Sequence, residues 1–139
     1  MPNENVALVQ AIYQGFAAGD VPAILERMSD DIEWNEAENF PYADRNPYCG
    51  PEAVLSGVFA RFGEEWDGFA VLPDDFVGDG DSVVVLGRYR GVYKATGRAF
   101  DAQFAHVWRV EDGKAVAFKQ YTDTLQAARV TERRGGPAA

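Results

Sequence analysis

Three ionisable side chains lie on predicted strands or at their ends: Glu36, His106 and Asp123. Residues 32–36 alternate between apolar and polar types, so Glu36 shares the face of Trp34, which should be buried. A carboxyl group beside an indole in an apolar pocket loses hydration, and its pKa should rise toward the range of a general base or acid. If the strand ends one residue earlier, Glu36 points to water instead, and the residues alone leave both alternatives open.

His106 is the only histidine, and it lies in a segment of two-residue alternation, residues 98–110. Phe104 and Trp108 share its face, and both are candidates for the lining of a pocket. A lone histidine on an apolar face is more often a buried core residue than a catalyst. Its alternative role is to donate a hydrogen bond to a substrate oxygen on which charge develops.

The last predicted strand, residues 114–123, offers two further candidates on opposite faces. Gln120 shares a face with Phe118, whereas Asp123 shares the other with Tyr121. Without a bulge the two cannot point into one pocket. The apolar pattern favours Gln120 inside, which would leave Asp123 on a face that contacts another subunit.

Scarce residue types and net charge exclude several function classes. With one cysteine, Cys49, and one histidine, the chain can form neither an internal disulfide nor a two-histidine metal site, and we expect no metal and no cofactor. The 13 basic against 22 acidic residues, a net charge of −9, argue against nucleic acids and anionic membranes as partners. No signal peptide or long apolar run is evident, so we expect a cytoplasmic protein.

The elements that must position these residues follow from periodicity and capping residues. We expect one α+β domain over residues 1–128, with a disordered tail over residues 129–139. Its three helices begin near Asn3 or Asn5, at Asp20 and at Pro51, with ends at Gly19, near Ser29 and near Trp66. A short strand follows the second helix, an irregular loop covers residues 37–50, and a meander of strands covers 69–78, 82–94, 98–110 and 114–123.

Aromatic residues supply the remaining pocket candidates. Those of the 37–50 loop are the least easily explained as core, because the loop also carries two prolines, and such a loop could cover the mouth of a pocket. The full set of aromatic candidates is Tyr13, Trp34, Phe40, Tyr42, Tyr48, Phe62, Trp66, Phe104 and Trp108.

Both faces of strands 82–94 and 98–110 are partly apolar. The three helices can cover one face only. A second copy of the chain is the economical cover for the other, so we expect a homodimer through the outer sheet face.

The order of elements and four short motifs resemble the SnoaL-like polyketide cyclases and ketosteroid-isomerase relatives of the nuclear-transport-factor-2-like superfamily. The resemblance covers residues 4 to about 125. The motifs are Phe16-Ala17-Ala18-Gly19-Asp20, Asp30-Asp31-Ile32-Glu33-Trp34, His106-Val107-Trp108-Arg109-Val110 with Asp112-Gly113-Lys114, and Gln120-Tyr121-Thr122-Asp123-Thr124.

This resemblance implies a cone-shaped fold, with three N-terminal helices on a curved, mostly antiparallel sheet, and commonly a dimer. It matches Glu36 to the proton-shuttling aspartate of ketosteroid isomerase, His106 to an oxyanion-hole position, and Asp123 to the acid/base aspartate of the cyclases. Tyr13 lies near the isomerase's oxyanion tyrosine, although Ile12 is the aligned residue.

The family includes enzymes and binders, so two functions are expected. The first is a cofactor-free isomerase or cyclase acting on a small, mostly apolar carbonyl compound. The alternative is a non-catalytic dimeric module that binds a small ligand in the same cone.

Overall fold

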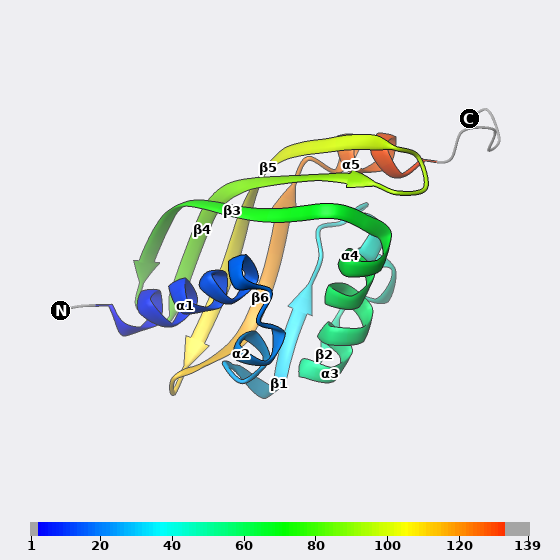
Figure 1. The fold of residues 1–139 in the computed structure, drawn as a ribbon. Coiled ribbons are helices and arrows are strands. Elements are labelled where there is room, and N and C mark those ends of the chain that lie inside the picture. The colour runs from blue at the N-terminus through cyan, green and yellow to red at the C-terminus, as the bar shows by residue number, and fades with distance from the viewer. Residues whose placement is uncertain (1–2, 133–139) are drawn as a thin grey trace.

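The structure, a computed structural model, describes residues 3–132 and has the expected α+β architecture. A curved sheet wraps around the N-terminal helices, which pack on its inner face (Figure 1). The six strands follow the order β2-β1-β6-β5-β4-β3, in which only the β1–β6 pair is parallel. They are β1 (Met28–Asn35), β2 (Tyr48–Cys49), β3 (Trp66–Asp79), β4 (Ser82–Tyr93), β5 (Arg98–Glu111) and β6 (Lys114–Thr122).

The first two helices, α1 (Glu4–Ala18) and α2 (Val21–Leu25), are bounded by the predicted capping residues. The Asn3 side chain accepts hydrogen bonds from two N–H groups of the first turn of α1, and the Asp20 side chain accepts one in α2. Gly19 ends α1 with a φ of 68°, a left-handed conformation that glycine adopts without steric cost.

The third helical segment comprises α3 (Pro51–Val54), the π-helical turn η2 (Leu55–Phe59) and α4 (Ala60–Glu65). Gly57 lies in the π turn against the ring of Tyr48, where an added Cβ would come within 2.3 Å of a ring carbon. Only glycine therefore allows this helix to pack so closely on the residues that precede it.

Alternation along the long strands determines which side chains face the helices. On β5, the even-numbered residues from Phe100 to Val110 are buried, as predicted. In the register of the sheet, His106 of β5 lies opposite Gln120 of β6 and Val85 of β4. The outer face leaves Leu86 and Tyr121 exposed.

Several boundaries differ from the sequence-based expectation; among them, β3 begins at Trp66 rather than near residue 69. The second helix ends at Leu25 rather than near Ser29, because Met28 already pairs with Ala115 in the sheet. The predicted strand 114–123 ends at Thr122, and an unpredicted helix, α5 (Thr124–Thr131), follows.

The tail expected over residues 129–139 therefore begins inside a helix. Val130 of α5 is buried, and its carbonyl accepts a hydrogen bond from the Thr96 hydroxyl. These contacts place the boundary of the folded domain beyond residue 128. Residues 133–139 lie outside the described residues.

Candidate functional site

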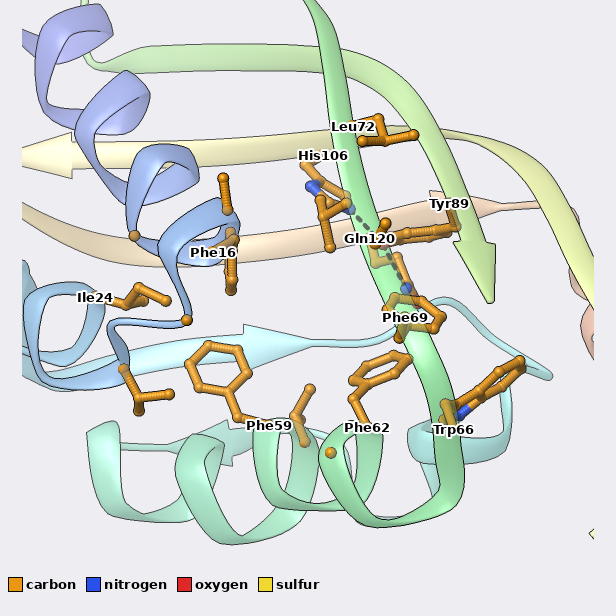
Figure 2. A pocket seen from close by; sticks show the side chains of 18 of the residues that line it. Phe16, Ile24, Phe59, Phe62, Trp66, Phe69, Leu72, Tyr89, His106 and Gln120 are labelled. Carbon is orange, nitrogen blue, oxygen red and sulfur yellow. Dashed lines mark hydrogen bonds between the residues drawn. The ribbon is translucent and has the colours of Figure 1, made fainter. Parts of the chain in front are cut away.

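A cavity of about 570 Å³ lies between the helices and the inner face of the sheet. Figure 2 shows rings from α1, the η2–α4 segment, β3 and β4 directed toward it. Six of the residues predicted for the site line this cavity: Trp34, Glu36, Phe62, Trp66, His106 and Gln120. Side chains that the sequence reasoning did not assign to the pocket complete much of the wall: Phe16, Ile24, Val58, Phe59, Phe69, Val71, Leu72, Tyr89 and Phe118.

Glu36 follows the last residue of β1 and is buried, as two-residue alternation predicted. The Trp34 indole N–H donates to its Oε2 at 2.9 Å, while Oε1 is buried without a hydrogen-bond partner among the described residues. Burial raises the pKa of this carboxyl group to about 7, although the Trp34 hydrogen bond and the charge of Arg61 partly oppose the shift. Near neutral pH, Glu36 can therefore both accept and release a proton.

The Asn46 side chain holds the backbone of Glu36 in place. Its Oδ1 accepts from the Glu36 N–H at 3.0 Å, and its Nδ2 donates to the Glu36 carbonyl at 2.8 Å. This amide provides both backbone partners just where β1 ends, and thereby fixes the direction of the Glu36 side chain.

His106 is buried between two tyrosines, each of which contacts one ring nitrogen. Its Nδ1 is hydrogen bonded to the Tyr13 hydroxyl and its Nε2 to the Tyr89 hydroxyl. Burial lowers the pKa of His106 well below its usual value, so the ring is neutral at physiological pH. Both nitrogens are engaged inside the protein, so His106 does not donate directly to a ligand as the sequence suggested.

The tautomer of His106 decides which tyrosine hydroxyl keeps a proton that can be donated to a ligand. A neutral imidazole has one N–H and one acceptor nitrogen, so one tyrosine donates to His106 and the other accepts from it. The Tyr13 hydroxyl already accepts from the Trp108 indole at 2.9 Å, and His106 is its only acceptor among residues 3–132. The Tyr89 hydroxyl likewise already accepts from Gln120, so this count alone fits either tautomer. Tyr89 lines the cavity and Tyr13 does not, so a hydroxyl proton without an acceptor costs less on Tyr89. We therefore assign the tautomer in which Tyr13 donates to Nδ1 and the Nε2–H of His106 donates to Tyr89.

Gln120 donates a second hydrogen bond to the Tyr89 hydroxyl, at 2.9 Å from its Nε2. In the assigned tautomer Tyr89 accepts twice, and its own O–H proton remains available on the cavity wall. Dashed lines in Figure 2 mark its contacts with His106 and Gln120. The Gln120 Oε1 accepts from the Ala37 N–H at 3.0 Å, beside Glu36. Gln120 therefore links the segment that carries the carboxyl group to the tyrosine that carries the donor.

Three predicted pocket aromatics of the 37–50 loop, Phe40, Tyr42 and Tyr48, are buried but do not line the cavity. The Tyr42 hydroxyl donates to Glu65 at 2.5 Å and accepts from the Trp66 indole at 3.0 Å. The loop, which includes the 3-10 helix η1 (Pro41–Arg45), is thus fastened to the end of α4 and to β3. These contacts give it a structural role rather than that of a lid.

The remaining predicted site residues lie elsewhere. Asp123 is exposed and caps α5 by accepting from the Gln126 N–H, so its expected place in the pocket is wrong. Tyr13, Phe104 and Trp108 are buried behind the cavity wall, where Tyr13 reaches the site only through His106.

Tyr89 is a cavity residue that the sequence reasoning did not assign to the site. It alternates along β4 with Arg88 and Arg90. Both arginines are exposed, and the same alternation turns Tyr89 inward. The position of Tyr89 between two charged residues of a strand was the available signal.

The described residues offer no evident metal centre and no membrane span. Among residues 3–132, no three His, Cys, Asp or Glu side chains lie close enough together to hold a metal ion. Within the same range, every helix is too short or too polar to cross a membrane.

Comparisons with known proteins confirm the expected fold. The sequence profile of the SnoaL-like domain matches residues 9–118. An NTF2-like protein from Burkholderia thailandensis E264 is 38% identical, with a TM-score of 0.89 over 93% of this chain and 98% of that one. TerC, co-crystallised with polyporic acid, is 26% identical, with a TM-score of 0.82 over 94% and 100% of the two chains.

An NTF2-like protein of unknown function from Burkholderia pseudomallei K96243 is also similar. It is 28% identical, with a TM-score of 0.85 over 94% of this chain and 99% of that one. No functionally curated protein matches the chain at a significant level.

Proposed function

The chain belongs to the SnoaL-like domain family, and from that premise we propose that it is a cofactor-free acid/base enzyme of the isomerase or cyclase type. Its substrate is a mostly apolar carbonyl compound that binds in the cavity. One observation carries the proposal: Glu36, whose Oε1 is buried without a hydrogen-bond partner, and Tyr89, whose hydroxyl proton is free in the assigned tautomer, both line one aromatic cavity.

The chemistry follows from these two groups. Glu36 removes a proton from the carbon next to the substrate carbonyl, and the electron pair of that C–H bond moves to the carbonyl oxygen to form an enolate. Tyr89 donates a hydrogen bond to this oxygen, strengthened by the two hydrogen bonds that its own hydroxyl accepts. Protonated Glu36 then returns the proton to another carbon, which completes an isomerisation. In a cyclase the enolate carbon instead attacks the carbon of a second carbonyl, whose π electron pair moves to its oxygen, and protonated Glu36 returns the proton to that oxygen.

The cavity wall supports an apolar substrate. Apart from two indole N–H groups that already have acceptors, the polar side chains of the lining are Glu36, Tyr89, His106 and Gln120. TerC, which was co-crystallised with polyporic acid, offers a precedent for an organic ligand on this fold.

Proton removal can be tested without knowledge of the natural substrate. The protein is incubated in D2O with 2-tetralone, an apolar ketone with acidic C–H groups, and deuterium incorporation is followed by NMR. We expect the wild type to accelerate exchange. Glu36→Gln should lower the rate by about 10²–10⁴-fold and Tyr89→Phe by about 10²–10³-fold.

Glu38→Gln is the matched control, because Glu38 is an exposed carboxylate two residues away. Equal exchange rates in the wild type and Glu36→Gln would refute the role of Glu36. Engagement of both His106 nitrogens inside the protein is the observation that favours the alternative, a non-catalytic binding module. Such a module would gain melting temperature on binding apolar ketones and accelerate exchange in none of them.

A further inference from the structure

Glu36 Oε1 is unusual among the buried polar atoms of this protein. It is the one buried side-chain oxygen or nitrogen of residues 3–132 that has no hydrogen-bond partner. A buried carboxylate without a partner is unfavourable, because no water or donor replaces its lost hydration. A ligand that supplies a positive charge at this atom would remove that cost.

The protein itself supplies no cation at this position. Neither lysine nor arginine lines the cavity. Arg61, whose charge acts on Glu36, instead directs both terminal nitrogens to Asp44, at 2.9 and 3.0 Å. The neutral ring of His106 adds no charge either. The charges around the cavity therefore favour binding of a cation over binding of an anion.

Aromatic rings form much of the wall around the carboxyl group. Phe69 of β3 packs against Phe62, Trp66 and Tyr89, with ring centroids 4.3, 5.2 and 5.2 Å apart. Trp34, whose N–H binds Glu36, stacks on Phe118 at 3.7 Å. Ring faces carry partial negative charge and attract organic cations, most strongly where water is excluded.

Together, these features match an alkylated ammonium ion. Such a cation is large, partly apolar and weakly hydrated, so it gives up less hydration than a metal ion or a primary ammonium group when it enters an aromatic cavity. It also needs no hydrogen-bond acceptor beyond a nearby negative charge. The cavity volume of about 570 Å³ leaves room for an organic substituent as well as the charged group.

We propose that this cavity binds small hydrophobic ammonium ions, with the positive nitrogen beside Glu36 Oε1 and the organic substituents against the aromatic wall. This ligand class goes beyond the proposed carbonyl chemistry, because no proton is removed from the cation. It uses the same carboxylate as its counter-ion and competes with a carbonyl compound for the same space.

The test compares two probes of the same shape that differ in charge. Phenyltrimethylammonium and tert-butylbenzene differ by the replacement of N⁺ with carbon. Amide NMR titrations of the intact chain give a dissociation constant for each and show whether cavity residues shift. We expect the ammonium ion to bind the wild type at least about tenfold more tightly than its neutral counterpart. In Glu36→Gln this preference should fall severalfold, and in the control Glu38→Gln it should persist.

A measurement on the wild type guards against a misfolded variant. At pH 6 the protonated Glu36 carboxyl should give a C=O stretching band in the infrared spectrum. Phenyltrimethylammonium should convert it to carboxylate and abolish the band, whereas tert-butylbenzene should leave it. Three groups of the protein interact electrostatically with the Glu36 carboxyl group: Arg61 of α4, Tyr48 of β2 and Tyr89 of β4. All three are present with either probe.

Two results would overturn the proposal: equal affinity for the two probes, or an ammonium preference that Glu36→Gln retains in full. Neither depends on catalysis. Loss of the ammonium preference with intact deuterium exchange in 2-tetralone would refute this inference alone. Failure of exchange with an intact ammonium preference would refute the proposed enzyme alone.

Discussion

Replacement of Glu36 by glutamine should make the protein more stable at neutral and alkaline pH. The buried Glu36 carboxyl has a pKa of about 7 in the folded protein, against 4.5 as its ordinary value. Above pH 7 the folded wild type must therefore keep a charged carboxylate in an apolar cavity, whereas the unfolded chain exposes the same group to water. Glutamine has nearly the same shape, can still accept the Trp34 hydrogen bond and does not ionise.

The expected magnitude follows from the two pKa values. The folded state binds the proton more tightly, so the favourable contribution of Glu36 is fully present below pH 4.5 and is lost as pH rises through 7. The gap between the values corresponds to roughly 3 kcal/mol. The difference in unfolding free energy between Glu36→Gln and the wild type should therefore increase by about this amount between pH 4.5 and pH 8.

Urea unfolding of both proteins at several pH values measures this difference directly. His106 also titrates differently in the folded and unfolded states, but it is present in both proteins, so its contribution cancels. Glu38→Gln, at an exposed site, should show no such increase. A difference between Glu36→Gln and the wild type that stays constant with pH would show that Glu36 is not desolvated, and the proposed base would lose its physical basis.

Three further predictions follow from the same contacts. The lone imidazole of His106 should show no protonation in a proton NMR titration from pH 5.5 to 8, because burial holds its pKa well below the usual value; a midpoint near 6.5 would contradict the buried Tyr13–His106–Tyr89 chain. Asp123→Ala should lower the unfolding free energy by about 0.5–2 kcal/mol through loss of the α5 cap, measured by urea unfolding, and should leave deuterium exchange unchanged. Loss of deuterium exchange in Asp123→Ala would contradict this and would indicate that Asp123 takes part in proton transfer. Finally, light scattering should give about twice the chain mass of 15.3 kDa, because the outer sheet face exposes Leu86 and Tyr121, and Leu86→Lys should shift this mass toward the monomer; a wild-type monomer at micromolar concentration would refute the dimer.

Much of the fold was predictable because local rules determine it. Asn3, Gly19 and Asp20 terminate helices through contacts with their immediate neighbours. Alternation on β5 assigned His106 to the buried face, and continued alternation from β1 gave burial as one of two alternatives for Glu36, the one that the structure has. Asp123 misled because the same aspartate that ends a strand can begin a helix, and a short helix has only a weak periodic signal.

The composition of the site was less predictable, because its members come from distant parts of the chain. Tyr13 of α1 and Tyr89 of β4 meet the same imidazole of β5, and only the placement of α1 on the sheet brings Tyr13 there. The register of β5 with β6 puts Gln120 opposite His106, within reach of Tyr89. Alternation indicates that a side chain points inward but not which polar atom it meets.

The sequence by itself determined most of the order of elements and the inward-facing residues of β5, and it offered a buried position beside Trp34 as one of two alternatives for Glu36. The tertiary structure decided that both nitrogens of His106 are hydrogen bonded to tyrosines, that Asn46 and Gln120 hold the Glu36 segment, and that Tyr42 anchors its loop to α4 and β3. The physical reason is that periodicity and capping arise from neighbours along the chain. Hydrogen bonds between side chains require atoms to meet within about 3 Å, which only strand register and helix packing can arrange.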